Sequence, residues 1–464
     1  MTAKRIKLVE GGETLAGTGA VEGTVYMFGM GDIGQLGISA EKRKFPALVP
    51  ELPNGGKEGV QVQCGGTHTV VLLKDGTVYT YGNNDDFALG RDTPDEEDMK
   101  EPGKVELKGK VVQVTAGDSH SAALTADGEV YLWGNFRDSN GFMGLIPGNE
   151  KKSVKSPVLL TLFKSPGEAI NIKITKIASG SNHLIMLGED NHIYTCGCGE
   201  QGQLGRQKLR SSSRRTAGSN LSDKDYMLTP LLVRTLGAKK VIEIWAGDFT
   251  TYCKVKSGPV WVFGLNNYGQ LGVEPEPEGT EPTILVPVKS GGLLGNNWVQ
   301  ISAGEHHALA LDADGKVHSL GRNQDGRLGL GPTHESEQTI WVATAVPRLE
   351  NDVCVQIACG LSTSYAIKKN KNQVFAWGFG VNYQLATGDD EDQTEPTPCK
   401  FSIRDDTLEN VVYLSAGAQH VGLIRSETVA QENHIDVPEL KEPKRKTAKA
   451  STLQRTASTK RAKK

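Results

Sequence analysis

The sequence is poor in aromatic residues, in disulfide-type cysteine spacing and in long hydrophobic runs. Aromatic residues make up 6% of the 464 residues, and no apolar run approaches the roughly 20 residues that span a bilayer. The cysteines, seven in all, are odd in number and scattered, which does not suit a disulfide framework and favours a reducing compartment. The first residues do not have the pattern of a signal peptide. We therefore expect a soluble intracellular protein that does not contact a membrane.

Motifs of the common catalytic and metal sites are also absent from the sequence. Despite 55 glycines, no G-x-x-x-x-G-K-[ST] loop occurs, so the chain is not expected to hold a nucleotide itself. No G-x-S-x-G elbow, H-E-x-x-H pair or Cys/His metal spacing is present. We therefore predict a protein without a metal, without a cofactor and without covalent catalysis.

Charge is distributed unevenly along the chain. Residues 441–464 contain ten Lys and Arg and one acid, so removing them from the totals of 52 basic and 55 acidic residues leaves 42 and 54. The body is thus acidic and the tail strongly basic. Such a charge block does not fold on its own and suits either nuclear import or a phosphate-rich partner. A solvated end without a partner is the simpler alternative.

A glycine pair recurs along the chain and defines a repeat. The pair is eight residues apart in GMGDIGQLG, GNNDDFALG, GCGEQGQLG, GLNNYGQLG and GRNQDGRLG, and a sixth copy, GFGVNYQLA, ends in Ala386. The seventh, GNFRDSNGFMG, separates its glycines by ten residues. Repetition at a long period indicates a solenoid or propeller. The leading glycines are Gly29, Gly82, Gly134, Gly197, Gly264, Gly321 and Gly378.

A second signature precedes most of these pairs and predicts an antiparallel hairpin. Its copies include CGGTHTVVLLKDGTVYTYG at 64–82, AGDSHSAALTADGEVYLWG at 116–134 and AGEHHALALDADGKVHSLG at 303–321. Apolar residues alternate on both sides of an Asp-Gly pair, which is typical of a two-residue hairpin turn with positive φ angles. Each repeat is therefore expected to be a small antiparallel sheet.

Seven such units predict an all-β fold, a seven-bladed β-propeller. The last signature, at 416–424, lacks its second strand, and GTVYMFG at 23–29 is that missing half. The N-terminal strand is therefore expected to complete the C-terminal blade and close the ring. We predict a flexible segment at 1–22, the propeller at 23–426 and a disordered basic tail at 427–464. A WD-type propeller is disfavoured because its period is about 40–45 residues.

The stretch FRDSNGFM, residues 136–143, is where the repeat departs from its own spacing. Its loop is longer than the others and carries Arg137 and Asp138, which packing does not need. A projecting charged loop on a rigid scaffold indicates a binding function. A tolerated surface insertion is the alternative.

Four segments carry a resemblance to a known family. PGKVEL (102–107), VVQVTAGDSHSAALTADGEVYLWGNFRDSNG (111–141), CGCGEQGQLGR (196–206) and GRLGLG (326–331) resemble the family of the regulator of chromosome condensation. Members of that family are guanine nucleotide exchange factors for the small GTPase Ran. The resemblance spans residues 23–426 and implies the same fold and activity.

The resemblance also implies site residues. In that family the insertion is a β-wedge directed into the GTPase, and here it would run from Phe136 to Met143, with Arg137 matching the family's wedge arginine. The GTPase contacts implied within it are Phe136, Arg137, Asp138, Ser139, Asn140 and Gly141. Other residues implied on the same face are Asp32, Asp118, Asn182, Glu200, Arg206, His307 and His420. The long loop after Arg206 implies a histone contact through Arg214 or Arg215. The tail motif PKRK, with Lys444, Arg445 and Lys446, is assigned to nucleosomal DNA and to nuclear import receptors, which places the protein on chromatin in the nucleus.

Two of these assignments have alternatives. Histidine recurs at one position of five signatures, which indicates that most of these imidazoles anchor the blades by hydrogen bonds; they are His68, His120, His183, His307 and His420. Asp32 could equally be a turn residue. Asn182 stands where the family carries an aspartate, so part of the expected electrostatic role is lost there.

The leading hypothesis is that the protein promotes GDP release and GTP loading on Ran while bound to chromatin. The chain would thereby support nucleocytoplasmic transport, spindle assembly and nuclear envelope formation. A propeller scaffold that has lost exchange activity is the alternative, which the departures at Asn182 and Ala386 suggest. An enzyme with a site in the central channel is least favoured because no catalytic constellation is present.

Overall fold

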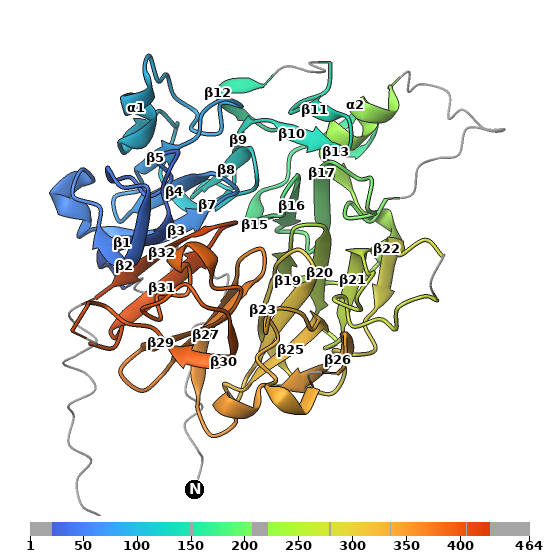
Figure 1. Cartoon of the computed structure of the whole chain (residues 1–464). Helices are drawn as coiled ribbons and strands as arrows, with labels where there is room; N and C mark the ends of the chain where they lie inside the picture. Colours follow the sequence, from blue (N-terminus) through green and yellow to red (C-terminus); the bar gives the residue numbers. More distant parts are fainter. Residues whose placement is uncertain are drawn as a thin grey trace, which may run out of the picture.

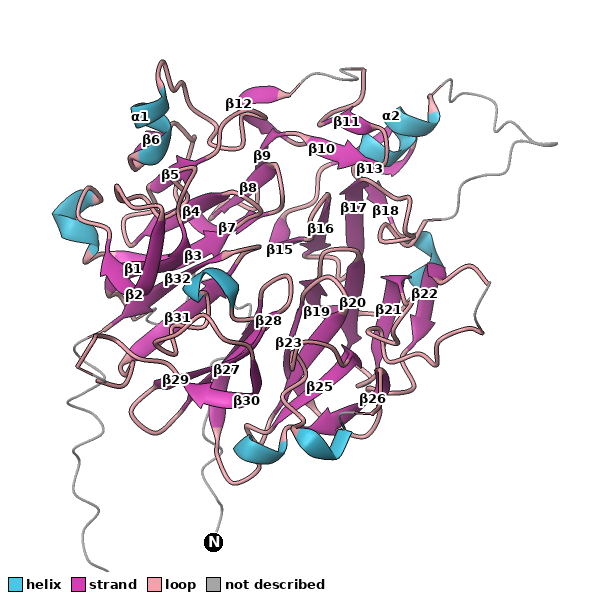
Figure 2. Ribbon diagram, viewed as in Figure 1, coloured by secondary structure: helices cyan, strands magenta, loops and turns pink. Residues whose placement is uncertain are grey.

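The computed structural model describes residues 21–148, 153–206, 221–277, 280–334, 336–404 and 406–426. In this part of the chain, strands dominate and the helices are short (Figure 2). Six four-stranded sheets and one six-stranded sheet surround a central axis (Figure 1). The predicted seven-bladed β-propeller is confirmed.

The blades follow chain order, each with its first-named strand innermost. Blade one contains β3 (Gly59–Cys64), β4 (His68–Leu73), β5 (Val78–Gly82) and β6 (Gly103–Val105). Blade two contains β7 (Val111–Ala116), β8 (His120–Thr125), β9 (Val130–Gly134) and β12 (Val154–Leu159). Blade three contains β15 (Ile174–Ser179), β16 (His183–Gly188), β17 (Ile193–Gly197) and β18 (Leu231–Leu232), and its sheet is extended by β13 (Leu162–Ser165) and β14 (Glu168–Ile170).

Blades four to seven contain β19 (Val241–Ala246), β20 (Thr250–Val255), β21 (Val260–Leu265) and β22 (Thr283–Lys289); β23 (Trp298–Ala303), β24 (His307–Asp312), β25 (Val317–Arg322) and β26 (Thr339–Ala345); β27 (Cys354–Cys359), β28 (Thr363–Lys368), β29 (Gln373–Gly378) and β30 (Gln393–Pro398); and β31 (Val411–Ala416), β32 (His420–Arg425), β1 (Thr24–Met30) and β2 (Lys42–Leu48). Outside the blades lie β10 (Phe136–Asp138), β11 (Gly141–Gly144), α1 (Glu96–Lys100), α2 (Asp223–Leu228) and five 3-10 turns at Pro53–Gly56, Arg234–Leu236, Pro332–His334, Pro347–Leu349 and Val381–Tyr383.

Blade seven joins the two ends of the described chain. β1 pairs antiparallel with β32 over six residues, from Thr24 opposite Arg425 to Gly29 opposite His420. The blade therefore combines two C-terminal strands with two N-terminal strands. Such pairing covers the edge that an open array of blades would expose.

A glycine follows the innermost strand of each blade, at one end of the central channel, which we call the channel mouth. These glycines explain why the hairpin signature contains a glycine three residues before its histidine. Gly65 and Gly117 belong to neighbouring blades, and the amide of Gly66 donates to the carbonyl oxygen of Gly117 at 3.1 Å. A Cβ atom on Gly117 would lie 2.5 Å from the carbonyl oxygen of Gly180 in the next blade. The equivalent glycines meet in the same way around the whole ring, because there the backbones approach too closely for any side chain; they are Gly65, Gly117, Gly180, Gly247, Gly304, Gly360 and Gly417.

The hairpin turns differ from the predicted two-residue type. In blade two, the amide of Thr125 donates to the carbonyl oxygen of Glu129 at 2.9 Å, and the amide of Gly128 donates back to Thr125 at 3.0 Å. Three residues therefore form the loop, and of these only Gly128 has a positive φ, 83°. This is a three-residue hairpin with a glycine bulge, so Asp127 need not adopt the left-handed region.

The recurring histidines connect five of the seven blades to the next one along the ring. Ser121 donates its hydroxyl to the carbonyl oxygen of Ala88 at 2.9 Å, so the imidazole of His68 must donate from Nε2 to the Ser121 oxygen, 2.8 Å away. His183, His307 and His420 make the same bond to Thr251, Ser364 and Thr69 at 3.0 Å each. All are buried, which confirms the interpretation of these imidazoles as blade anchors.

Acid is expected to weaken the fold through these histidines. Burial lowers the pKa of His68 to about 4 and the pKa values of His183, His307 and His420 to about 3. Below the ordinary histidine pKa near 6.5, these imidazoles bind a proton in the unfolded chain but stay neutral in the native state. The free energy of unfolding therefore falls as the pH falls, by about 1.4 kcal/mol per pH unit for each imidazole. Asp248 acts in the opposite direction, since burial and neighbouring charges raise its pKa to about 8.

Urea unfolding between about pH 7.5 and pH 5.5 measures this slope. His68→Gln provides the matched variant, because its amide can still donate to Ser121 but does not titrate. The variant is expected to flatten the slope by the contribution of one imidazole. An unchanged slope would contradict the role of His68.

Candidate functional site

The insertion after β9 forms a separate two-stranded hairpin, β10 and β11. Arg137 lies opposite Phe142 and Asp138 opposite Gly141, and the amide of Asn140 donates to the Asp138 carboxylate at 2.9 Å. Gly141 has a φ of 98°, which the turn requires and which other residues rarely adopt. Arg137, Ser139, Asn140 and Phe142 are exposed. We refer to residues 136–144 as the wedge.

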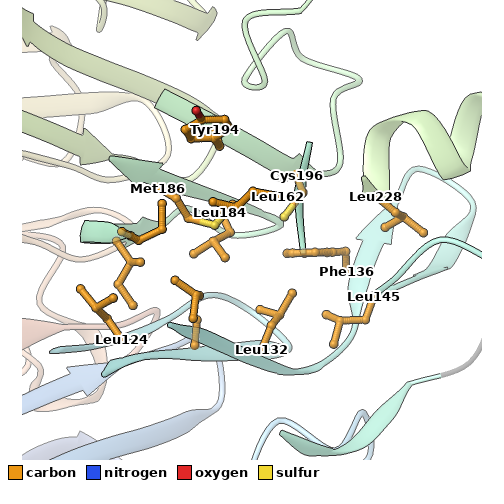
Figure 3. Close-up of a cluster of buried hydrophobic side chains, with 14 of the residues drawn as sticks. Leu124, Leu132, Phe136, Leu145, Leu162, Leu184, Met186, Tyr194, Cys196 and Leu228 are labelled. Carbon is orange, nitrogen blue, oxygen red and sulfur yellow. The ribbon is translucent and has the colours of Figure 1, made fainter. Parts of the chain in front are cut away.

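The base of the wedge is fixed in the largest described hydrophobic cluster. Phe136 is fully buried, lies close to Leu145, Leu228 and Cys196 (Figure 3), and has its ring centroid 4.6 Å from that of His120. The resemblance implied a GTPase contact for Phe136. The structure corrects this expectation, because a side chain without exposed area can only anchor the hairpin.

Arg137 is held on three sides. Its Nε and Nη2 lie 2.8 and 2.6 Å from Oδ2 of Asp86 in the loop after β5. Its guanidinium stacks on the Phe142 ring, 4.9 Å from the centroid. Its backbone amide donates to Oδ1 of Asn182 at 2.8 Å. The side chain nevertheless stays 45% exposed, so a fixed positive charge faces solvent.

Asn182 bridges the wedge and Asp118. While its carbonyl oxygen accepts from Arg137, its amide nitrogen donates to Oδ2 of Asp118 at 3.1 Å. A carboxylate at position 182 could not donate this bond and would face Asp118 with a like charge. The departure to asparagine therefore completes a hydrogen-bonded chain, although it removes one negative charge from this face.

The tip of the wedge is tied to blade three. The amide and hydroxyl of Ser139 both donate to the Glu200 carboxylate at 2.8 Å. Asp138, with a side chain only 4% exposed, pairs with Lys224 of α2 at 3.0 Å. Ser139 and Glu200, both assigned by the resemblance to the GTPase contact, thus bind one another here, and Lys224 binds Asp138 beside them.

Carboxylates gather at the channel mouth beside the wedge. Asp118, Asp248 and Glu305 each follow a mouth glycine. Burial raises the pKa of Asp248 to about 8, and the nearby Asp118 and Glu305 charges contribute to the shift. Burial also raises the pKa of Asp118. The cavity below, about 210 Å³, is lined by the inner strands. A carboxyl with a pKa of about 8 is mostly protonated at neutral pH, so the negative charge that favours a basic partner at this end of the channel rests on Asp118 and Glu305 and not on Asp248.

Three predicted contact residues have structural roles instead. The Arg206 guanidinium donates to Thr195 and to the carbonyl oxygens of Tyr226 and Met227 at 3.1–3.2 Å, which fixes α2. His307 and His420 are 0% and 1% exposed and form the blade anchors described above. Because both imidazoles are buried, neither is accessible to a partner, and we assign His307 and His420 to the blade anchors.

The remaining predicted residues are placed differently. Asp32 is exposed and accepts from Nε2 of Gln35 at 3.2 Å, which suits both a turn residue and a surface contact. Arg214, Arg215, Lys444, Arg445 and Lys446 lie outside the described residues. Within the described ranges, no His, Cys, Asp and Glu side chains converge as a metal site, and no helix has the length and hydrophobicity to cross a membrane.

Sequence reasoning missed Asp86, Lys224 and Asp248. Asp86 contacts the wedge from another blade, 51 residues away in the sequence, and nothing in its own repeat points to Arg137. Lys224 follows a long polar loop whose path no spacing rule predicts. Asp248 was detectable in principle, because it follows a mouth glycine as Asp118 does.

Comparisons with known proteins agree on one family. The family model described as RCC1-like domain matches residues 24–423. The regulator of chromosome condensation of Mus musculus is 43% identical over 409 residues, which cover 87% of this chain and 90% of that protein. The guanine nucleotide exchange factor SRM1 of Saccharomyces cerevisiae is 30% identical over 439 residues, 85% of this chain and 86% of the relative.

A solved structure extends the comparison to three dimensions. The crystal structure of Prp20p from Saccharomyces cerevisiae, reported with its binding properties to Gsp1p and histones, superposes with a TM-score of 0.76 at 27% identity. The match covers 89% of this chain and 94% of that chain.

Proposed function

This chain belongs to the RCC1-like domain family, and on that premise we propose that it is a guanine nucleotide exchange factor for the small GTPase Ran. The chain promotes release of GDP and loading of GTP while it is bound to chromatin. The observation that carries the proposal is the exposed Arg137 on a hairpin that neighbouring blades hold in place. The exchange factor among its relatives and the Gsp1p-binding structure support the same activity.

Exchange on this propeller involves no covalent step. The acidic channel mouth attracts a basic surface of the GTPase, and the wedge enters beside its phosphate-binding region. Arg137 supplies a positive charge, together with N–H donors beyond those that contact Asp86, for oxygen atoms of the partner. Because the wedge weakens nucleotide binding, the nucleotide must weaken wedge binding by the same factor. Exchange therefore passes through a nucleotide-free complex, which either GTP or GDP resolves, and the cellular excess of GTP sets the direction.

The scaffold alternative has no support from the two departures that suggested it. Ala386 is fully buried and adopts a φ of 50° like the glycines it replaces. Asn182 completes the hydrogen bonds of the wedge. Neither residue disturbs the propeller or displaces Arg137.

The same proposal places the protein in the nucleus. Lys444, Arg445 and Lys446 engage import receptors and nucleosomal DNA, and Arg214 or Arg215 contacts histones. The histone-binding relative supports this assignment. Bound to chromatin, the chain generates the GTP form of Ran that supports nucleocytoplasmic transport, spindle assembly and nuclear envelope formation.

The proposal is tested by isolating the nucleotide-free complex. Purified chain is mixed with Ran stripped of nucleotide, and the mixture is separated by size-exclusion chromatography with light scattering. We expect a one-to-one complex that either GTP or GDP dissociates. Binding that ignores added nucleotide would support the scaffold alternative, and absence of a complex would contradict the proposal.

Removal of the basic tail is expected to weaken nucleosome binding in a salt-dependent way. A chain ending at residue 430 lacks the ten basic residues of the tail. The slope of log affinity against log salt becomes shallower by about 0.9 for every DNA phosphate that the tail neutralises. Fluorescence anisotropy with labelled nucleosomes, across a salt series, measures the slope. An unchanged slope would show that the tail does not contact DNA, and GDP release by the shortened chain is expected to stay at the full-length rate.

A further inference from the structure

A buried acid in blade one faces the wedge arginine. Asp86 lies in the loop GNNDDFALG and is 3% exposed, whereas its neighbour Asp85 is exposed. Its Oδ2 accepts two bonds from Arg137, at 2.8 and 2.6 Å. Among the described residues its Oδ1 has no hydrogen-bond partner. The Arg137 guanidinium is therefore its counter-charge.

The loop that carries Asp86 differs from the same loop in four other blades. The next residue, Phe87, has a φ of 60° at a position where Gly34, Gly202, Gly269 and Gly326 occur in those copies, and in blade six Tyr383 takes this position with a φ of 61°. A phenylalanine in the left-handed region costs backbone energy that a glycine does not, and such strain persists where the surroundings hold it. Blade one thus keeps a strained loop that directs Asp86 inward, toward the wedge of blade two.

We propose that Asp86 is a positioning residue for Arg137 that fixes the guanidinium between its carboxylate and the Phe142 ring. The inference rests on the proposed exchange function and deepens it. A free arginine samples many rotamers, and ordering it at the moment of binding opposes association. Here the ordering is complete before the GTPase arrives. The buried carboxylate is little screened by salt, so the arrangement holds at physiological ionic strength.

Two other roles for this pair make different predictions. If Asp86 restrains the wedge and must release Arg137 before exchange, its removal speeds exchange. If Asp86 only stabilises blade one, its removal lowers the stability of the fold, and any effect on nucleotide exchange is the same with or without Arg137. A positioning residue instead acts only while Arg137 is present, so the two substitutions are non-additive.

The test compares Asp86→Asn, Arg137→Ala and the double variant in the full chain. Release of fluorescent GDP from Ran is measured over a range of Ran concentrations. We expect Asp86→Asn to slow exchange roughly five- to tenfold, the equivalent of ordering one flexible side chain, and to add nothing in the Arg137→Ala background. Faster exchange, or a further slowing in that background, would overturn the inference.

A second measurement does not depend on exchange activity. The Nε–H resonance of Arg137 in the free protein is expected to be protected from solvent in the wild type and to lose this protection in Asp86→Asn. Asp325→Asn is the matched control, because it removes the carboxylate charge from an Asp–Arg contact of 2.7 Å to Arg327 in the equivalent loop of blade five; it should leave both readouts unchanged. If the Arg137 Nε–H is protected in the wild type but the chain does not release GDP from Ran, the inference stands and the proposed function is overturned. If the Nε–H is unprotected in the wild type, only the inference is overturned.

Discussion

Replacing Arg137 with alanine is expected to reduce the exchange rate on Ran by about 100- to 1000-fold, the range seen when one pre-organised donor is removed from a site. Arg137 is the exposed cation of the wedge, and the contacts to Asp86, Phe142 and Asn182 hold it in one place. Stopped-flow release of fluorescent GDP measures the effect. Arg137→Lys is expected to recover little of the rate, because an ammonium cannot reproduce the planar fork that Asp86 and Phe142 hold.

The stability of this variant must be followed in parallel. Alanine at position 137 leaves Asp86 buried without its counter-charge, and a stranded buried group costs about 1–3 kcal/mol. Urea unfolding should show this loss, and Asp86→Asn in the same chain should recover part of it. Arg404→Ala, which removes an exposed arginine outside the wedge, is expected to leave both exchange and stability unchanged. Wild-type exchange by a folded Arg137→Ala variant would contradict the wedge assignment.

The Gly117→Ala substitution is expected to destabilise the propeller by about 3 kcal/mol or more, at the upper end of overpacking effects. The added methyl would collide with the His120 ring and lie 2.5 Å from the carbonyl oxygen of Gly180. Both neighbours belong to the closed ring around the channel, so neither can move without disturbing a blade. Urea unfolding of the purified variant measures the loss.

Gly291→Ala is the matched control for this prediction. A methyl on Gly291 would meet nothing closer than 3.8 Å, and its backbone does not lie in the left-handed region. We expect a change within about 0.5 kcal/mol there. A Gly117→Ala variant as stable as Gly291→Ala would show that the blades can separate at the mouth, contrary to the packing described above.

The fold was predictable because its cause is local. The mouth glycines occur at fixed spacing in each blade, and the anchoring histidines in five of the seven, since every blade must approach its neighbours closely. The turn type was not predictable, because Asp-Gly suits both a two-residue turn and a three-residue turn with a glycine bulge. Only the bonds between Thr125, Gly128 and Glu129 distinguish the two.

The candidate site was predictable in part. Loop length identified the wedge, and the resemblance identified Arg137, but neither reports burial. Phe136, Arg206 and His307 were therefore assigned as contacts with the GTPase, although their side chains pack against or hydrogen-bond to other parts of the propeller. Asp86 was missed for the opposite reason, since its role depends on a contact between two blades that sequence distance conceals.

Release of fluorescent GDP from Ran by the wild-type chain tests the central claim most directly. The chain is added at a concentration well below that of Ran, in the presence of excess unlabelled GTP. We predict that release accelerates in proportion to the amount of chain, with many turnovers per molecule, and that the Arg137→Ala variant abolishes most of the acceleration. A folded wild-type chain that leaves the intrinsic release rate of Ran unchanged would contradict the claim that this propeller is an exchange factor.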